Sequence, residues 1–118
     1  MAGQLEDRVA VITGAGEGIG RGIASAFVKE GAKVVIAEIN AELGNAAVSE
    51  LGDNAIFVET DVSLKEDNER MIAAAVDQWG TLDILVNNAW GGGVISRVES
   101  KSPESVSYTH LTLPTISR

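Results

Sequence analysis

The sequence predicts an α/β fold in which helices cover both faces of a parallel sheet, and three observations support this prediction. Four short runs of valine, isoleucine and leucine alternate with longer segments whose apolar residues recur at helical spacing. Glycines follow several of the helical segments, where helices commonly end. Strand-helix-strand connections are right-handed in nearly all known cases, so four strands and three helices predict a truncated, doubly wound sheet of order 3-2-1-4.

The four predicted strands are continuous apolar runs that are too short for core helices. They are Val9 to Thr13, Lys33 to Glu38, Ala55 to Thr60 and Leu82 to Asn87. A doubly wound sheet binds ligands beyond the carboxyl ends of its strands, where the strand order reverses. We therefore expect the functional residues directly after these four runs.

The helical spacing and its end signals predict three helices. The first extends from about Gly18 to Glu30 and ends at Gly31, and the second extends from about Ala41 to Leu51. Asn40 is expected to cap the second helix and Gly52 to end it.

The third predicted helix has the clearest start signal. Ser63 and Glu66 have the spacing of a capping box, in which the two side chains satisfy backbone N–H groups at the start of a helix. Apolar residues at helical spacing follow, and Gly80 is expected to end this helix.

Composition excludes several classes of function. The chain has 118 residues, with 9 basic and 17 acidic side chains and a formal net charge of −8 at pH 7, which predicts a single acidic globular domain. Neither nucleic acid nor an anionic membrane is an expected partner, because both attract basic surfaces. The chain contains no cysteine, so disulfides and thiol chemistry are excluded and a cytoplasmic location is expected. No signal peptide, membrane span or metal site is predicted.

A glycine-rich loop follows the first predicted strand and leads directly into a helix. Its spacing is Gly-x-x-x-Gly-x-Gly, and the candidate binding residues are Gly14, Gly16, Glu17, Gly18, Ile19 and Gly20. Glycines let the backbone approach a pyrophosphate closely, and a helix N-terminus supplies unpaired N–H groups with a partial positive charge. The alternative is a flexible turn without a ligand. The strand before it, the helix after it and an acidic residue ending the next strand favour a Rossmann-like dinucleotide-binding unit.

Glu38 is that acidic residue, 18 positions after Gly20. A carboxylate at this place can accept hydrogen bonds from the adenosine-ribose hydroxyls of NAD, and it repels the 2′-phosphate of NADP. Glu17 adds a second negative charge, so NAD is the expected cofactor and NADP is less favoured. Arg21 is the one nearby basic candidate, and we interpret it as part of a solvated helix face. The alternative for Glu38 is likewise a solvated charge at a strand end.

These residues, with Asp61-Val62 and Asn87-Asn88-Ala89, resemble the short-chain dehydrogenase/reductase family over about Arg8 to Ala89. The resemblance implies an NAD(P)-dependent oxidoreductase that transfers hydride between the nicotinamide and a small alcohol or carbonyl substrate. It also implies that Asp61 contacts the adenine amino group and Val62 the adenine ring, although Asp61 could instead cap a helix. Asn88 and Ala89 would line the ribose near the nicotinamide, and Asn87 would have a structural role.

The sequence departs from the family pattern in two places. Trp90 stands where the family usually has the glycine of Asn-Asn-Ala-Gly, although three glycines follow it. The family's catalytic Tyr-x-x-x-Lys motif is not found, since Tyr108 is followed four residues later by Thr112. We therefore assign no catalytic residue and expect the chain alone to be inactive. The family also implies a homotetrameric parent protein.

The C-terminal residues have a different character. Val106 to Thr115 resemble the frame translation of a transposon-based sequencing adaptor, which predicts that residues 1–104 form the truncated dinucleotide-binding domain and residues 105–118 are a read-through tail. The alternative is a genuine tail. Two functions follow: the NAD-binding half of a short-chain oxidoreductase, or a non-catalytic dinucleotide-binding module.

Overall fold

A parallel sheet lies at the centre of the molecule, and helices pack on both of its faces. The computed structural model describes residues 3–88, 94–98 and 108–112, the last two segments by their backbone. The elements are β1 (Val9–Thr13), α1 (Gly18–Lys29), β2 (Lys33–Glu38), α2 (Ala41–Leu51), β3 (Ala55–Glu59), α3 (Lys65–Trp79), β4 (Ile84–Asn87), β5 (Val94–Val98) and β6 (Tyr108–Thr112).

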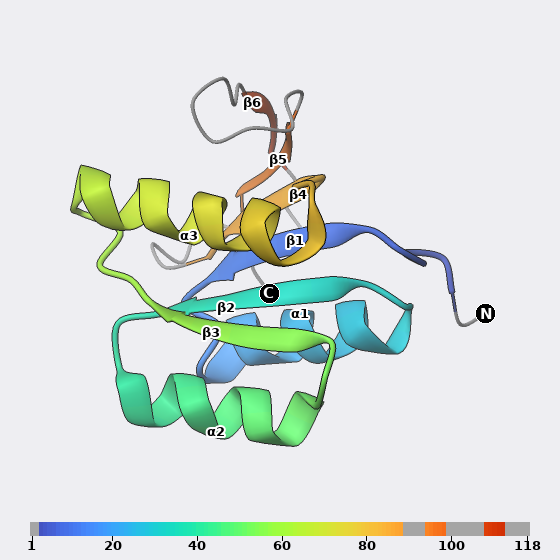
Figure 1. The fold of residues 1–118 in the computed structure, drawn as a ribbon, viewed down its shortest axis with the longest axis horizontal. Helices are drawn as coiled ribbons and strands as arrows, with labels where there is room; N and C mark the ends of the chain where they lie inside the picture. Colours follow the sequence, from blue (N-terminus) through green and yellow to red (C-terminus); the bar gives the residue numbers. More distant parts are fainter. Residues whose placement is uncertain (1–2, 89–93, 99–107, 113–118) are drawn as a thin grey trace.

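The sheet has the order β3-β2-β1-β4-β5-β6, and its first four strands are parallel to one another. This confirms the predicted order 3-2-1-4. Helices α1 and α2 cover one face of the sheet, and α3 covers the other, as Figure 1 shows. The strand order reverses between β1 and β4, so the glycine loop after β1 lies beside the segment that follows β4.

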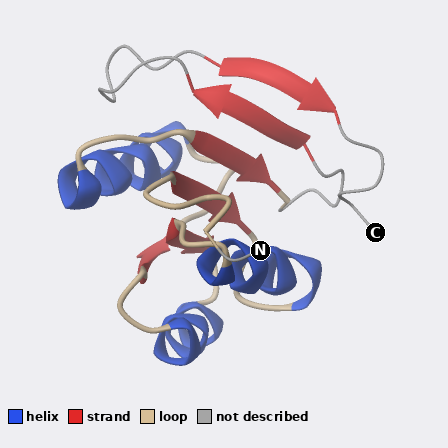
Figure 2. Ribbon diagram, turned by 90° about the vertical axis from the view of Figure 1, so that its right-hand side faces the viewer, coloured by secondary structure: helices blue, strands red, loops and turns tan. Residues whose placement is uncertain are grey.

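Strands β5 and β6 extend the sheet beyond the four strands that the sequence predicted. Both are antiparallel to their neighbours (Figure 2). Asn87 lies opposite Val94, and Val98 lies opposite Tyr108. A sheet that ended at β4 would present a row of unpaired backbone N–H and C=O groups, and β5 pairs with them. β6 lies within residues 105–118, for which the sequence predicted a read-through tail.

The strands are continuously apolar because both of their faces are buried. Ala10 and Ile12 of β1 belong to the core cluster that includes residues of α1 and α2, whereas Val9 and Val11 belong to the cluster that includes residues of α3. All four are at most 1% exposed. Alternate side chains of one strand therefore hold helices on opposite faces of the sheet.

Most of the predicted helix ends are confirmed. The side chain of Asn40 accepts a hydrogen bond from the backbone N–H of Leu43 at 3.0 Å and so caps α2. Gly31, Gly52 and Gly80 all have positive φ angles, between +83° and +97°, which suit glycine after a helix. None of the helices in the described ranges is long and apolar enough to cross a membrane.

The predicted capping box of the third helix is wrong. Helix α3 begins at Lys65, and its N-cap residue Leu64 makes no side-chain capping bond. The Ser63 hydroxyl instead donates to Oδ1 of Asp61 at 2.7 Å. In a capping box the serine oxygen accepts from a backbone N–H of the helix, whereas here the Ser63 hydroxyl donates to a carboxylate, which is a strong acceptor, and Ser63 points toward Asp61.

Candidate binding site at the carboxyl ends of the parallel strands

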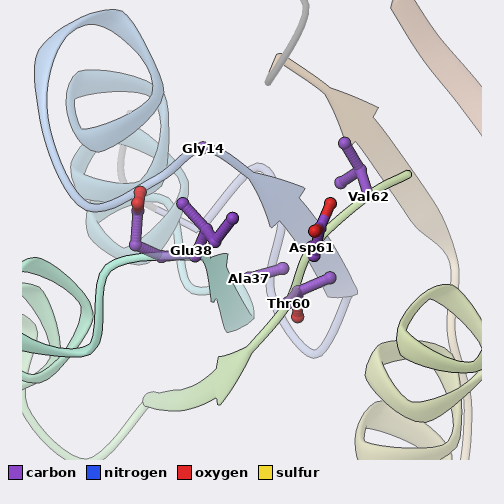
Figure 3. A pocket seen from close by; sticks show the side chains of 7 residues that line it. Gly14, Ala37, Glu38, Thr60, Asp61 and Val62 are labelled. Atoms are coloured by element: carbon purple, nitrogen blue, oxygen red, sulfur yellow. The ribbon is translucent and has the colours of Figure 1, made fainter. Parts of the chain in front are cut away.

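A cavity of about 270 Å³ lies at the carboxyl ends of β1, β2 and β3. In Figure 3, Glu38 approaches it from the end of β2, and Asp61 and Val62 approach it from the segment after β3. The lining residues are Gly14, Ala37, Glu38, Ile39, Thr60, Asp61 and Val62. The fold therefore brings together three segments that are far apart in sequence, at the place where doubly wound sheets bind ligands.

The glycine loop is shaped by close approaches that a side chain would prevent. A Cβ at Gly16 would lie 2.7 Å from Oε1 of Glu38, and a Cβ at Gly20 would lie 2.3 Å from the carbonyl oxygen of Gly14. Gly14 and Gly18 have φ angles of +64° and +65°. Each of the loop glycines thus has a steric or conformational reason to be glycine.

The start of α1 is available to an anionic ligand. Its N-cap residue, Glu17, makes no side-chain capping bond, so the side chain leaves the first N–H groups of the helix for another acceptor. Glu17, Gly18 and Ile19 are exposed at this helix start, and 45% of Ile19 is accessible. The loop and the helix start together can hold a phosphate group.

Glu38 is buried and held by two backbone groups. Its Oε1 accepts a hydrogen bond from the N–H of Gly16 at 2.9 Å, and its Oε2 accepts one from the N–H of Asn40 at 3.0 Å. The residue is 8% exposed, so the solvated-charge alternative is wrong. These bonds fix a carboxylate in the cavity wall, where its remaining lone pairs can accept from hydroxyl groups.

Arg21 is more constrained than a solvated helix face. Its Nη2 lies 2.6 Å from Oε1 of Glu50, and its Nη1 donates to the carbonyl oxygen of Gly16 at 3.4 Å. The Arg21 side chain is 28% exposed and the Glu50 side chain 68%. The cation nearest to the glycine loop is therefore already paired with an acidic residue of α2.

Asp61 lies on the opposite side of the cavity from Glu38. Its Oδ1 accepts hydrogen bonds from the hydroxyl of Ser63 at 2.7 Å and from the N–H of Ser63 at 3.0 Å. These two bonds, the hydroxyl bond first, lower the pKa of Asp61 below its ordinary value. Asp61 does not cap α3, because that helix begins only at Lys65.

The segment after β4 is tied to the glycine loop through Thr13. The N–H of Asn88 donates to Oγ1 of Thr13 at 2.9 Å, and this hydroxyl lies 3.2 Å from Oδ1 of Asn87. The Asn88 amide also donates to the carbonyl oxygen of Gly14 at 3.5 Å. Asn87 and Asn88 therefore brace β4 against the end of β1. Ala89 and Trp90 lie outside the described residues.

A comparison with family models matches residues 8–110 to the short chain dehydrogenase family. The chain belongs to this family. The match includes the glycine loop, the strand end at Glu38, the Asp61-Val62 pair and the segment after β4.

Individual relatives agree with the family assignment. The chain is 45% identical over 86 residues to sorbitol dehydrogenase of Cereibacter sphaeroides, which covers 73% of this chain and 34% of the relative. It is 42% identical over 93 residues to 7alpha-hydroxysteroid dehydrogenase of Escherichia coli K12, covering 76% of this chain and 36% of the relative. The chain therefore spans about a third of the length of these curated relatives.

A solved structure shows the same fold. The crystal structure of 3-ketoacyl-(acyl-carrier-protein) reductase from Brucella melitensis complexed with NADH superposes with a TM-score of 0.69 at 43% identity. The superposition covers 70% of this chain and 34% of that protein.

Sequence reasoning missed several residues of the site. Thr13, Ala37, Ile39 and Thr60 were assigned no role, yet Thr13 joins the two loops and the other three line the cavity. The sequence signal for Ile39 is an apolar residue directly after the acidic end of a predicted strand, and in the structure this side chain is 61% exposed, which suits a ligand surface. Thr13 gave no local signal, since the residues that its hydroxyl contacts after and at the end of β4 are more than 70 positions away in sequence.

Proposed function

We propose that the cavity binds the adenosine half of NAD. The observation that carries this proposal is the Glu38 carboxylate, buried in the cavity wall and fixed by the N–H groups of Gly16 and Asn40. Held in this way, it presents lone pairs to the two hydroxyls of the adenosine ribose without needing to reorganise.

The other lining residues suit the rest of this ligand. The Asp61 carboxylate would accept from the adenine amino group, and the apolar side chains of Val62 and Ile39 would hold the two sides of the ring. The loop from Gly14 to Gly20 and the start of α1 would hold the pyrophosphate. Asn88 and Ala89 would then lie along the ribose next to the nicotinamide. The close approaches at Gly16 and Gly20 fit such a cradle.

We propose NAD rather than NADP because the charges near the ribose are negative. Glu38 lies in the cavity wall, and Glu17 is exposed at the adjacent helix start. Arg21 is engaged with Glu50, so its charge is already partly neutralised. Two like charges about 4 Å apart near a protein surface repel each other by about 4 kcal/mol before salt screening. This is more than the roughly 1.4 kcal/mol that corresponds to a tenfold preference for NAD.

When bound, NAD would accept a hydride from an alcohol substrate or, as NADH, donate one to a carbonyl. The residues of this chain would bind and orient the cofactor for that transfer. We further propose that the 118 residues by themselves bind the cofactor without turnover. Thr112 stands four positions after Tyr108, and these residues contain no Tyr-x-x-x-Lys motif. A small alcohol or carbonyl substrate, a homotetrameric assembly and a cytoplasmic location are proposed for the parent protein.

The test is calorimetric titration of the purified chain with NAD and with NADP, repeated on the variant Glu38→Gln. We expect NAD to bind at least about tenfold more tightly than NADP, and the variant to lose most of this preference. Glutamine can still accept from Gly16, and a thermal melt of the variant checks its fold. Equal or tighter binding of NADP by the unmodified chain would contradict the choice of NAD, and binding of neither nucleotide would contradict the proposed function.

A further inference from the structure

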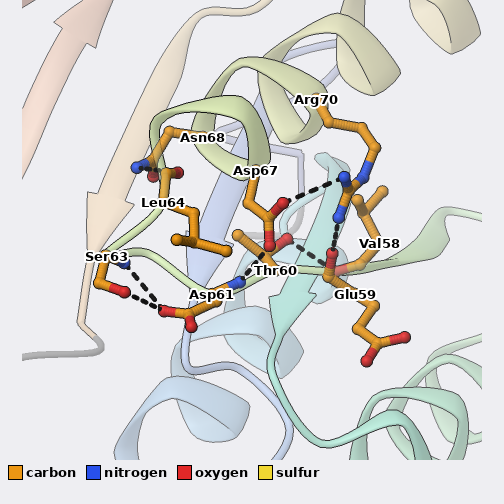
Figure 4. Close-up of polar contacts among 9 residues, drawn as sticks. All are labelled: Val58, Glu59, Thr60, Asp61, Ser63, Leu64, Asp67, Asn68 and Arg70. Carbon is orange, nitrogen blue, oxygen red and sulfur yellow. Dashed lines mark hydrogen bonds and ion pairs between the residues drawn. The ribbon is translucent and has the colours of Figure 1, made fainter.

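We propose that three polar side chains of α3 position the adenine side of the cavity and thereby set the affinity for the adenine end of the cofactor. These side chains are Asp67, Asn68 and Arg70, here called the α3 clamp (Figure 4). None of them lines the cavity, so they are positioning residues that act through Asp61 and Val62. This inference rests on the proposed function.

The α3 clamp contacts the segment 59–64, which leaves the sheet where it reaches the cavity. The last sheet-like bond of this segment is donated by the N–H of Thr60 to the carbonyl oxygen of Glu38, at 3.0 Å. Strand β3 has already ended at Glu59. The positions of Asp61 and Val62 therefore depend on contacts other than the strand ladder.

Asp67 and Arg70 hold the first part of this segment. The Asp67 Oδ2 accepts a hydrogen bond from the N–H of Asp61 at 2.9 Å, and its Oδ1 lies 3.1 Å from Nη1 of Arg70. Arg70 in turn donates through Nη2 to the carbonyl oxygen of Glu59 at 2.6 Å. The Asp67 side chain is 16% exposed, so its carboxylate is partly shielded from water. This shielding strengthens the hydrogen bonds that the carboxylate makes.

Asn68 holds the second part. Its side-chain amide donates to the carbonyl oxygen of Val62 at 2.9 Å and to that of Leu64 at 3.0 Å. Without Asn68, each of these two carbonyl oxygens would need a hydrogen bond from water or from another group in a different local conformation. Together with Asp67, Asn68 fixes the backbone immediately on both sides of the Asp61-Val62 peptide.

The side chain of Asp61 is aligned by the same segment. Both of its bonds to Ser63 end on Oδ1, and among the described residues no hydrogen bond to its Oδ2 is present. The clamp sets the backbone of Asp61, and Ser63 sets its rotamer. The second carboxylate oxygen is thus placed for a ligand by preorganised contacts, which reduces the entropy that binding must remove.

The experiment compares two halves of the cofactor as probes. Adenosine monophosphate reports on the adenine side, and nicotinamide mononucleotide reports on the opposite end, which the clamp does not touch. Both are titrated, together with NAD, into the 118-residue chain and its variants while backbone amide shifts are followed by NMR. The variants are Asn68→Ala, Asp67→Ala, Asp67→Asn and, as a matched control on the same helix, Glu69→Ala, whose side chain is exposed.

We expect Asn68→Ala to weaken adenosine monophosphate and NAD by about tenfold, because two hydrogen bonds to the segment are lost. Nicotinamide mononucleotide should change by less than about twofold on the same scale. Asp67→Asn keeps an acceptor for the Asp61 N–H, so it should retain more adenine affinity than Asp67→Ala. Glu69→Ala should match the unmodified chain with every probe.

Three results would overturn the inference. Unchanged affinity for adenosine monophosphate in Asn68→Ala and Asp67→Ala would show that the α3 clamp does not influence binding on the adenine side. Equal losses for both half-cofactors would show a general loosening of the fold instead. Binding of neither NAD nor adenosine monophosphate by the unmodified chain would overturn the proposed function and this inference with it. If Asn68→Ala does not fold, the comparison of Asp67→Asn with Asp67→Ala tests the same inference.

Discussion

Two glycines of α1 should respond in opposite ways to the same substitution. A Cβ at Gly20 would lie 2.3 Å from the carbonyl oxygen of Gly14 and 2.6 Å from Nδ2 of Asn88. A Cβ at Gly22 would meet nothing within 4 Å. Both positions lie in the same helix, and neither has a positive φ angle. The substitutions Gly20→Ala and Gly22→Ala therefore differ in their tertiary contacts and not in local conformation.

The magnitudes follow from two opposing terms. Alanine is favoured over glycine in a helix interior by about 1 kcal/mol, and this gain applies at both positions. Overpacking at Gly20 costs about 3 kcal/mol, the upper part of the usual range, because the nearest atom belongs to backbone. That backbone is itself held by the bond from the Gly14 N–H to the carbonyl oxygen of Ala37, at 2.8 Å. We expect Gly20→Ala to lose about 2 kcal/mol and Gly22→Ala to gain about 1 kcal/mol.

Urea unfolding measures both changes. With a slope of about 2 kcal/mol per molar urea, the midpoints of the two variants should lie about 1.5 M apart, on opposite sides of the unmodified chain. Far-ultraviolet circular dichroism follows the loss of the helices in each variant. Equal midpoints for the two variants would refute the reasoning, because helix propensity would then be the one term that matters.

Three further predictions concern the site. Ser63→Ala removes one of the bonds that lower the pKa of Asp61, so that pKa should rise toward its ordinary value. Folding lowers this pKa, so the stability that the carboxylate contributes is present at neutral pH and is lost as pH falls through the lowered value; in the variant this contribution should be smaller and its loss should be complete at a higher pH. An NMR titration of Asp61 that gives the same pKa in both chains would contradict this account. Thr13→Val leaves the N–H group after β4 without its acceptor and should cost about 1–3 kcal/mol in urea unfolding, whereas Thr13→Ser should cost much less; similar losses would argue against the hydrogen bond. Glu50→Gln releases Arg21 from its ion pair and should strengthen NADP binding by about two- to fivefold with little change for NAD; an unchanged ratio in calorimetry would mean that Arg21 has no influence on the ribose site.

The glycine loop and Glu38 could be predicted because their signals are local. The loop glycines follow a strand at fixed spacing, and Glu38 ends the next strand, so their positions at the same sheet edge follow from the parallel order. The contact between Glu38 and the Gly16 N–H is a tertiary detail of an arrangement that the spacing already implied.

The start of α3 shows why a local signal can mislead. Ser63 and Glu66 have the spacing of a capping box, but the Ser63 hydroxyl can either accept from a backbone N–H of the helix or donate to the Asp61 carboxylate two residues earlier, and it donates to Asp61. A sequence pattern contains both options. The path of the chain out of β3 and into α3 decides between them, and so does the bond that Asp67 makes with the Asp61 N–H.

The sequence by itself determined the α/β class, the strand order β3-β2-β1-β4, the glycine loop and the acidic strand end. Apolar period, glycine placement and the right-handed crossover are properties of short segments, so they can be read without knowing what packs against them. Tertiary structure decided the Thr13 bridge, the Arg21–Glu50 pair, the α3 clamp and the antiparallel strands β5 and β6. Each of these depends on which donor meets which acceptor once the backbone is folded, and such pairings are selected by proximity in space and by the cost of leaving polar groups unpaired.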